Sequence, residues 1–140
     1  MANTLYDKGR ERFATANLSW TADTLKVILV DTSSYTPNFA THEWRSDISD
    51  SSVIAPSTPG AGLPLTSKTA TGGACDAADS TFTSVAGASI EAIIIYKDTG
   101  TAGTSPLIAY IDTATGLPIT PNGGDIIVTW DNGPNRIFKL

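Results

Sequence analysis

The fold of this chain is decided by the stretch Ser89-Ile-Glu-Ala-Ile-Ile-Ile-Tyr-Lys-Asp98, Thr99-Gly-Thr-Ala-Gly-Thr-Ser-Pro106 and Leu107-Ile-Ala-Tyr-Ile-Asp112. The first part contains a run of isoleucines, 93 to 95, followed by Tyr96, and such residues suit a pleated sheet. The unbroken apolar run predicts a strand that is covered on both faces. The middle part is rich in glycine and small hydroxyl residues, which predicts a loop. We therefore expect two neighbouring antiparallel strands, of which the first lies at the centre of the fold.

Further strands are predicted at short, regular spacing along the rest of the chain. The clearest are Leu25–Asp31, an edge strand around Val53, Ala74–Val85, a strand of core character over Asp125–Asp131, and Arg136–Leu140. Roughly eight short strands of this kind predict an all-β protein built as a two-sheet β-sandwich. The long excursion over residues 32–64 allows strands to cross between the sheets, which favours a jelly-roll or Greek-key order.

One or two short helices are expected near the N-terminus. Asn3 or Thr4 can cap a helix over Leu5–Phe13. Gly9 lies inside this helix and weakens it by about 1 kcal/mol relative to alanine. A second helical turn is expected over Thr41–Ile48. The fold class predicted from the sequence is therefore all-β with this small helical addition.

Composition limits the partners that the protein can have. A chain of 140 residues predicts a single domain over 1–140, and only 16% of its residues are charged, against ~25% in ordinary soluble domains. A surface poor in charge suggests contact with another protein, although an all-β chain with many turns has a similar composition. The net charge of −5 argues against a nucleic-acid partner. The sequence contains neither a membrane-spanning apolar stretch nor a signal-peptide pattern, so we expect synthesis in a cytoplasm and no membrane partner.

The sequence offers no constellation of residues for catalysis or for binding a cofactor or metal. His42 is the sole histidine and is interpreted as a solvated surface residue, and Cys75 as a buried, inert thiol. Several aspartates fall at predicted strand ends. They could gather as a calcium or sugar site, but aspartate is common in turns because it bonds its own backbone, and we favour the turn interpretation. We therefore predict that the protein is not an enzyme and has no catalytic, cofactor-binding or metal-binding residues.

Four segments carry a resemblance to a known family. They are Asn3-Thr-Leu-Tyr-Asp-Lys-Gly-Arg10, Ser89-Ile-Glu-Ala-Ile-Ile-Ile-Tyr-Lys-Asp-Thr-Gly100, Ser105-Pro-Leu-Ile-Ala-Tyr-Ile-Asp112 and Pro121-Asn-Gly-Gly-Asp-Ile-Ile-Val-Thr-Trp-Asp131. The chain resembles the head cement (decoration) proteins of tailed bacteriophages over nearly its whole length. The resemblance implies a jelly-roll that coats the outer capsid surface of the virion and clamps neighbouring capsomers. The expected partner is the major capsid protein, and we also expect self-association as a symmetric dimer on the shell.

Three groups of residues are candidates for binding such a partner. They are a basic face on the N-terminal helix, a set of aromatic residues that could form a platform, and the C-terminal strand, which could pair with a neighbour: Lys8, Arg10, Arg12, Tyr35, Phe39, Trp44, Arg136 and Phe138. The aromatic set also leaves a second function open. On that alternative, the chain is a carbohydrate-binding or receptor-binding β-sandwich of a phage tail.

Overall fold

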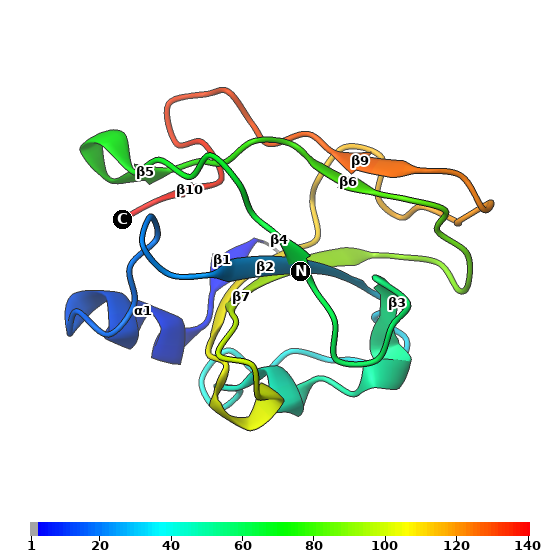
Figure 1. Cartoon of the computed structure of the whole chain (residues 1–140), viewed down its shortest axis with the longest axis horizontal. Helices are drawn as coiled ribbons and strands as arrows, with labels where there is room; N and C mark the ends of the chain where they lie inside the picture. The colour runs from blue at the N-terminus through cyan, green and yellow to red at the C-terminus, as the bar shows by residue number, and fades with distance from the viewer. Residues whose placement is uncertain (1–2) are drawn as a thin grey trace.

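The computed structural model describes residues 3–140, and its ordered elements are short strands joined by turns (Figure 1). The strands are β1 (Thr4–Leu5), β2 (Leu25–Val30), β3 (Val53–Ala55), β4 (Leu63–Pro64), β5 (Ala74–Cys75), β6 (Ser80–Phe82), β7 (Ala92–Lys97), β8 (Leu107–Ile111), β9 (Ile126–Val128) and β10 (Phe138–Lys139). The helices are α1 (Asp7–Ala14) and the single 3₁₀ turns η1 (Arg45–Asp47), η2 (Asp50–Ser52), η3 (Thr71–Gly73) and η4 (Ala102–Thr104). A mostly-β protein with one short N-terminal α-helix is thus confirmed.

The strand predicted to be central is the central strand of the main sheet. This sheet has the order β1-β8-β7-β2-β3, and β4 also pairs with β2. β7 pairs antiparallel with β2 over its whole length, with Ile94 opposite Ile28. On its other side β7 pairs antiparallel with β8, with Ile94 opposite Tyr110. The prediction of two neighbouring antiparallel strands from one stretch of sequence is therefore confirmed.

Both faces of the main sheet are covered, as the apolar run predicted. The helix layer, which we define as α1 with residues 31–52 and 98–106, lies below the sheet in Figure 1. The strand-pair layer, which we define as the pairs β5–β10 and β6–β9, lies above it. Ile94 and Tyr96 pack into the core on the helix-layer side, whereas Ile93 and Ile95 pack into the core under the strand pairs. β7 therefore contributes to two cores at once. Each of these buried side chains stabilises the fold by about 1.5–3 kcal/mol.

The N-terminal helix begins later than predicted. Thr4 and Leu5 pair with β8 as β1, and the helix begins at Asp7 without a side-chain cap. The Asn3 side chain, predicted to be a helix cap, instead accepts hydrogen bonds from the backbone N–H groups of Asp112 and Thr113. Pairing with β8 provides hydrogen bonds to backbone groups of Thr4 and Leu5 that a longer helix would otherwise have provided. It also joins β1 to the main sheet.

The structure refines three further predictions of local structure. The helical turn expected over Thr41–Ile48 is present as the single 3₁₀ turn η1. The predicted strand Ala74–Val85 is broken into β5 and β6, which pair with different partners, β10 and β9. The 125–131 strand has the expected core character at Val128 and Trp130, but β9 is shorter than predicted and the Ile127 side chain is 61% exposed. In each case a tertiary contact, which local periodicity does not encode, sets the boundary.

Candidate partner-binding surfaces

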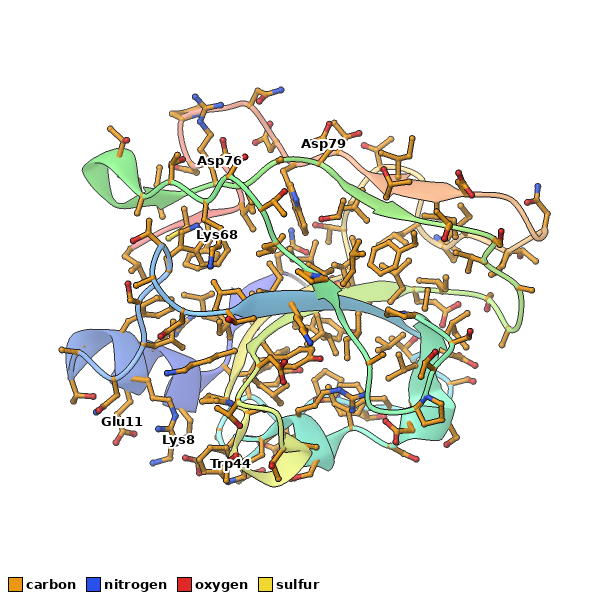
Figure 2. All side chains as sticks on the ribbon, in the orientation of Figure 1. Lys8, Glu11, Trp44, Lys68, Asp76 and Asp79 are labelled. Atoms are coloured by element: carbon orange, nitrogen blue, oxygen red, sulfur yellow. The ribbon has the colours of Figure 1, made fainter. Side chains whose placement is uncertain are left out.

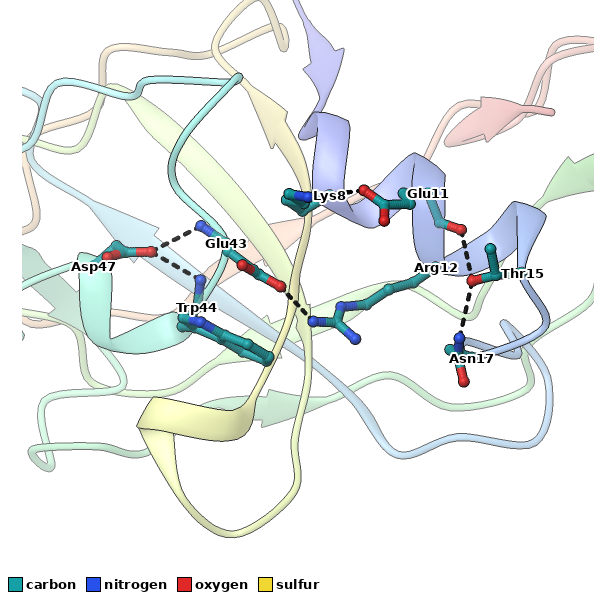
Figure 3. Close-up of polar contacts among 8 residues, drawn as sticks. All are labelled: Lys8, Glu11, Arg12, Thr15, Asn17, Glu43, Trp44 and Asp47. Atoms are coloured by element: carbon teal, nitrogen blue, oxygen red, sulfur yellow. Dashed lines mark hydrogen bonds and ion pairs between the residues drawn. The ribbon is translucent and has the colours of Figure 1, made fainter.

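The cations of the N-terminal helix are paired within the molecule (Figure 3). Lys8 Nζ donates to Glu11 Oε2 at 2.9 Å, and this hydrogen bond raises the pKa of Lys8. Arg12 Nη2 lies 2.5 Å from Glu43 Oε1, and its guanidinium group lies 4.6 Å from the centre of the Trp44 ring. These two basic side chains therefore have acidic partners already, so the helix presents a largely neutralised face.

Arg10 is the most accessible of the three predicted basic contacts. Its Nη1 lies 3.8 Å from Asp7 Oδ1, and its Nη2 donates to Thr4 Oγ1 at 3.2 Å. Both of these contacts are exposed, and exposed ion pairs contribute little to stability. Arg10 can therefore exchange its two contacts for a partner's carboxylate with little loss of stability. Arg12 cannot, because its ion pair with Glu43 and its contact with Trp44 are half-buried.

A hydrogen-bonded chain of rings occupies the place where an aromatic platform was predicted. Tyr35 is buried, and its hydroxyl lies 2.9 Å from the Tyr6 hydroxyl and 2.9 Å from His42 Nδ1. Burial raises the pKa of Tyr35 to about 12. The backbone N–H of Asn38 also donates to His42 Nδ1, at 3.1 Å. His42 is therefore not the solvated surface residue that was predicted, because its ring fixes the loop over the helix-layer core.

The other two aromatic candidates are also engaged. Phe39 is half-buried, and its ring centre lies 5.3 Å from that of Tyr6 and 5.6 Å from that of Tyr110. Trp44 is half-buried beneath the Arg12 guanidinium group. Tyr35, Phe39 and Trp44 thus come from one region, but they do not form an open platform on which a sugar could stack.

Sequence reasoning missed a buried arginine in the same layer. Arg45 is only 2% exposed, and its Nη1 donates to the Ile48 carbonyl at 2.9 Å. Its Nη2 pairs with Asp50 Oδ1 at 2.9 Å. The guanidinium carbon lies 5.8 Å from the centre of the Tyr96 ring. Arginine is usually exposed, so nothing in the local sequence indicated that this side chain would hold the η1 and η2 turns against β7.

The C-terminal strand is tied into the strand-pair layer. β10 pairs antiparallel with β5, with Phe138 opposite Cys75. The Phe138 ring centre lies 5.2 Å from that of Trp20 and 6.1 Å from that of Phe13. Arg136 is exposed, with its Nη1 3.7 Å from Asp76 Oδ2. Phe138 therefore acts in the core, and Arg136 is the member of this pair that can reach a partner.

The acidic and thiol groups have structural roles. Side chains of Asp98 and Asp131 accept hydrogen bonds from the backbone N–H two residues on, as the turn interpretation predicts, whereas Asp125 accepts from the N–H of the distant Ser84. Cys75 is buried and makes no disulfide, and burial raises its thiol pKa to about 11. Within residues 3–140, no group of three or more His, Cys, Asp or Glu side chains could hold a metal ion. The same residues contain no helix that is long and apolar enough to cross a membrane.

A groove runs between the main sheet and the strand-pair layer. It encloses a cavity of about 800 Å³ beside β9, within the range typical of ligand sites. Its walls come from the main sheet, from the 113–119 segment and from the run that begins with β9. They combine apolar side chains with polar and charged ones, including Leu29, Ile93, Ile111, Trp130, Thr113, Asp131 and Arg136. Sequence reasoning did not find this groove, because its walls are far apart in the chain.

No known family model matches the chain, and no curated protein matches it either. Function must therefore be argued from the surface itself. Figure 2 places labelled side chains on both sides of the main sheet: Lys8, Glu11 and Trp44 lie on the helix-layer side, whereas Asp76 and Asp79 lie on the side of the strand-pair layer. On the first side Lys8 and Arg12 pair with Glu11 and Glu43, and on the second lie the groove and the exposed Ile127.

Proposed function

We propose that this protein is a non-enzymatic virion component that binds the outer surface of an assembled major capsid shell and clamps neighbouring capsomers. One observation carries the proposal. Among the described residues, the exposed large hydrophobic side chains are Ile127, 61% exposed, and Leu140, 60% exposed, and both belong to the strand-pair layer. Together with the internally paired charges, they favour binding to another protein by apolar and backbone contacts. The resemblance to phage cement proteins points to the capsid as that partner.

The mechanism is mass action on assembly. A protein that binds assembled capsomers, and not separated ones, stabilises the shell by its binding free energy. Each contact needs only modest affinity, since many symmetric copies act on one shell. The three-layer arrangement of the chain is compatible with a jelly-roll sandwich, which we propose as its finer topology, and with a symmetric dimer on the shell.

The copy number per particle tests this function. Virions of the phage or prophage that encodes the chain should contain it in an amount comparable with the major capsid protein, measured on a stained gel. Particles that lack it should release their genome at a lower temperature. A handful of copies per virion would contradict the shell function and favour the tail alternative, a receptor-binding or carbohydrate-binding module.

The strength of the charge contribution can be measured separately. Because Arg12 is held by Glu43, reversing its charge would disturb the fold, so Arg10→Glu is the cleaner substitution. We expect this variant to bind shells more slowly at low salt and equally well at high salt, since exposed charges steer encounter and are screened. Wild-type protein should remain on shells during a high-salt wash. If that wash alone removes it completely, the contact is mainly electrostatic.

A further inference from the structure

The pair Asn-Gly occurs twice in the chain, in the turns before and after β9. One pair is Asn122-Gly123, and the other is Asn132-Gly133. Asparagine is a thermolabile residue, and glycine after it removes the side chain that would shield the backbone nitrogen. That nitrogen can then attack the amide carbon of the asparagine side chain. Both asparagines are exposed, so water can reach each of them, but the contacts around the two pairs differ.

In the second pair a carboxylate contacts the attacking nitrogen. The backbone N–H of Gly133 donates to Asp131 Oδ1 at 3.1 Å. The carboxylate lies so close to the backbone that a Cβ atom on Gly133 would lie 3.0 Å from Asp131 Oδ2. The N–H lies in the peptide plane, whereas the nitrogen attacks perpendicular to that plane, so the bond to Asp131 does not block the attack. A carboxylate in this position can take the proton as a general base.

An arginine contacts the other reacting group of the second pair. Arg136 Nη1 donates to Asn132 Oδ1 at 3.3 Å, and Asp76 Oδ2 is farther from the same nitrogen, at 3.7 Å. The backbone N–H of Arg136 donates to the Gly133 carbonyl at 3.1 Å, and this closed turn keeps the arginine next to Asn132. A guanidinium group on the amide oxygen stabilises the negative charge that develops there when the amide carbon is attacked. Asn132 therefore has a base beside its attacking nitrogen and a cation on its amide oxygen.

The contacts of the first pair are neutral instead. The N–H of Gly123 donates to the Val85 carbonyl at 2.7 Å, and a backbone carbonyl accepts a hydrogen bond without taking the proton. Asn122 Oδ1 accepts from the N–H of Gly124 at 2.9 Å, which is a neutral donor. These bonds hold the reacting atoms in place but do not activate them. The same dipeptide thus stands in two different chemical environments within one fold.

We propose that Asn132 is a site of self-modification, at which the folded chain converts its own asparagine into aspartate and isoaspartate. Asp131 takes the proton of the Gly133 N–H as the nitrogen forms a bond to Asn132 Cγ. The bond from Cγ to Nδ2 then breaks, and this nitrogen leaves as ammonia with the proton that Asp131 held. Water opens the resulting cyclic imide at one of its two carbonyls. One opening gives aspartate, and the other gives isoaspartate, whose main chain is longer by a methylene group.

The conversion changes the surface of the strand-pair layer. Asn132 and Arg136 both belong to the wall of the groove, so the product adds a negative charge there. The new carboxylate can pair with Arg136 more strongly than the amide does, which makes the arginine less available to a partner. Each chain reacts once, so this is ageing of the protein and not enzymatic turnover. The inference does not depend on the proposed shell function.

The test compares the two pairs within one protein. Purified full-length protein is incubated at neutral pH and physiological temperature, and samples are digested and analysed by mass spectrometry. In folded protein we expect Asn132 to convert at least about tenfold faster than Asn122. In urea, where only the local sequence acts, the two rates should become similar. Equal rates in the folded protein, or conversion of Asn132 only after unfolding, would overturn the inference.

Two conservative variants test the roles of the neighbouring side chains. Asp131→Asn keeps an oxygen that can accept the Gly133 N–H but cannot take its proton, so it should slow conversion of Asn132 at least about tenfold. Arg136→Gln keeps a neutral donor and should slow it roughly threefold to tenfold, less than the loss of a donor in a buried site, because the arginine is exposed. Neither variant should change the rate at Asn122.

Melting of each variant is measured first, so that a changed rate is separated from a changed fold. If a variant does not fold, the comparison of Asn132 with Asn122 in wild-type protein still decides the question. A folded variant, either Asp131→Asn or Arg136→Gln, that converts Asn132 at the wild-type rate contradicts the inference.

Discussion

The two layers that cover the main sheet are held to it in different ways. The helix layer is joined to the sheet by backbone bonds, such as Leu107 N–H to the Glu43 carbonyl at 2.9 Å. Its 31–52 segment is also held to Tyr6, just before α1, by the Tyr6–Tyr35–His42 chain. The strand-pair layer consists of two separate two-stranded sheets that rest on the main sheet through apolar side chains. Two-stranded sheets are marginal by themselves. The strand-pair layer therefore depends on side-chain packing to stay in place, whereas the helix layer is also fixed by backbone bonds.

Buried polar atoms without hydrogen-bond partners occur on both sides of the main sheet. Tyr96 Oη, on the side of β7 that faces the helix layer, has no partner among the described residues, and packing there is close, since a Cβ atom on Gly62 would overlap it. Trp130 belongs to the wall of the groove, but its Nε1 is buried and has no hydrogen-bond partner among the described residues. An unpaired buried donor is a cost to stability.

The largest effect is expected from a charge in the shared centre of the two cores. Ile94→Asp places a carboxylate on a strand that is covered on both faces, so we expect no soluble, folded protein. Ile127→Asp is the matched substitution in the strand-pair layer, at an exposed position. Soluble yield and circular dichroism measure the outcome. Folded Ile94→Asp protein would show that β7 is not the common centre of both layers.

The next effect concerns the close packing of α1 on β8. A Cβ atom on Gly9 would lie 2.7 Å from the Leu107 carbonyl oxygen. Gly9→Ala should therefore destabilise the protein by about 1–3 kcal/mol, even though alanine favours helices. Gly103→Ala is the control, since nothing lies within 4 Å of its Cβ position. Urea unfolding measures both. An unchanged or raised stability in Gly9→Ala would mean that the helix layer is not firmly seated.

A smaller effect is expected from the hydrogen-bonded rings. Tyr35→Phe removes the hydroxyl that contacts both Tyr6 and His42, and should cost about 1–3 kcal/mol. Tyr6→Phe removes one of these contacts and should cost about 1 kcal/mol. Because the groups act together, the double variant should be little worse than Tyr35→Phe alone. Strictly additive losses in urea unfolding would argue against a coupled chain.

The smallest intervention leaves the protein unchanged and measures opening of the strand-pair layer. Cys75 on β5 is buried, and its thiol pKa is raised to about 11 in the folded state. In an opened layer the thiol regains an ordinary pKa of about 8.5. If a thiol reagent reaches Cys75 only when the layer opens, the labelling rate should rise with pH up to about 8.5 and then level off. It should also be faster than global unfolding. A rate that continues to rise toward pH 11 would indicate reaction in the closed layer instead.

The elements that the sequence predicted best are those whose pattern is local and strong. The sequence predicted a central strand over 93–96 and an antiparallel partner over 107–111, and the structure has both as β7 and β8. A strand was also predicted over the apolar segment 25–30, and in the structure this strand, β2, pairs with the other edge of β7. Weaker patterns predicted less. Val128 and Trp130 lie in the core as expected of their segment, but an alternating apolar strand has the same sequence whether its outer face, here Ile127, meets solvent or a second sheet.

For the candidate surfaces, residue type was a poor guide. Lys8 and Arg12 were chosen as free basic groups, but Glu11 and Glu43 pair with them, and Glu43 lies far from Arg12 in the chain. Of the residues chosen, Arg10 and Arg136 remain exposed. Whether they contact a partner stays a prediction.

The sequence by itself determined the β class and the central strands, because side-chain periodicity and β-branching act over a few residues. Only the tertiary structure explains why residue 9 is glycine and why Arg45 is buried, and only the tertiary structure shows where the groove lies. Each of these depends on atoms from segments that are distant in the chain: Gly9 on the Leu107 carbonyl, Arg45 on Tyr96, and the groove on β9 and the main sheet. Local propensity cannot encode such contacts, because they exist only once the layers have packed.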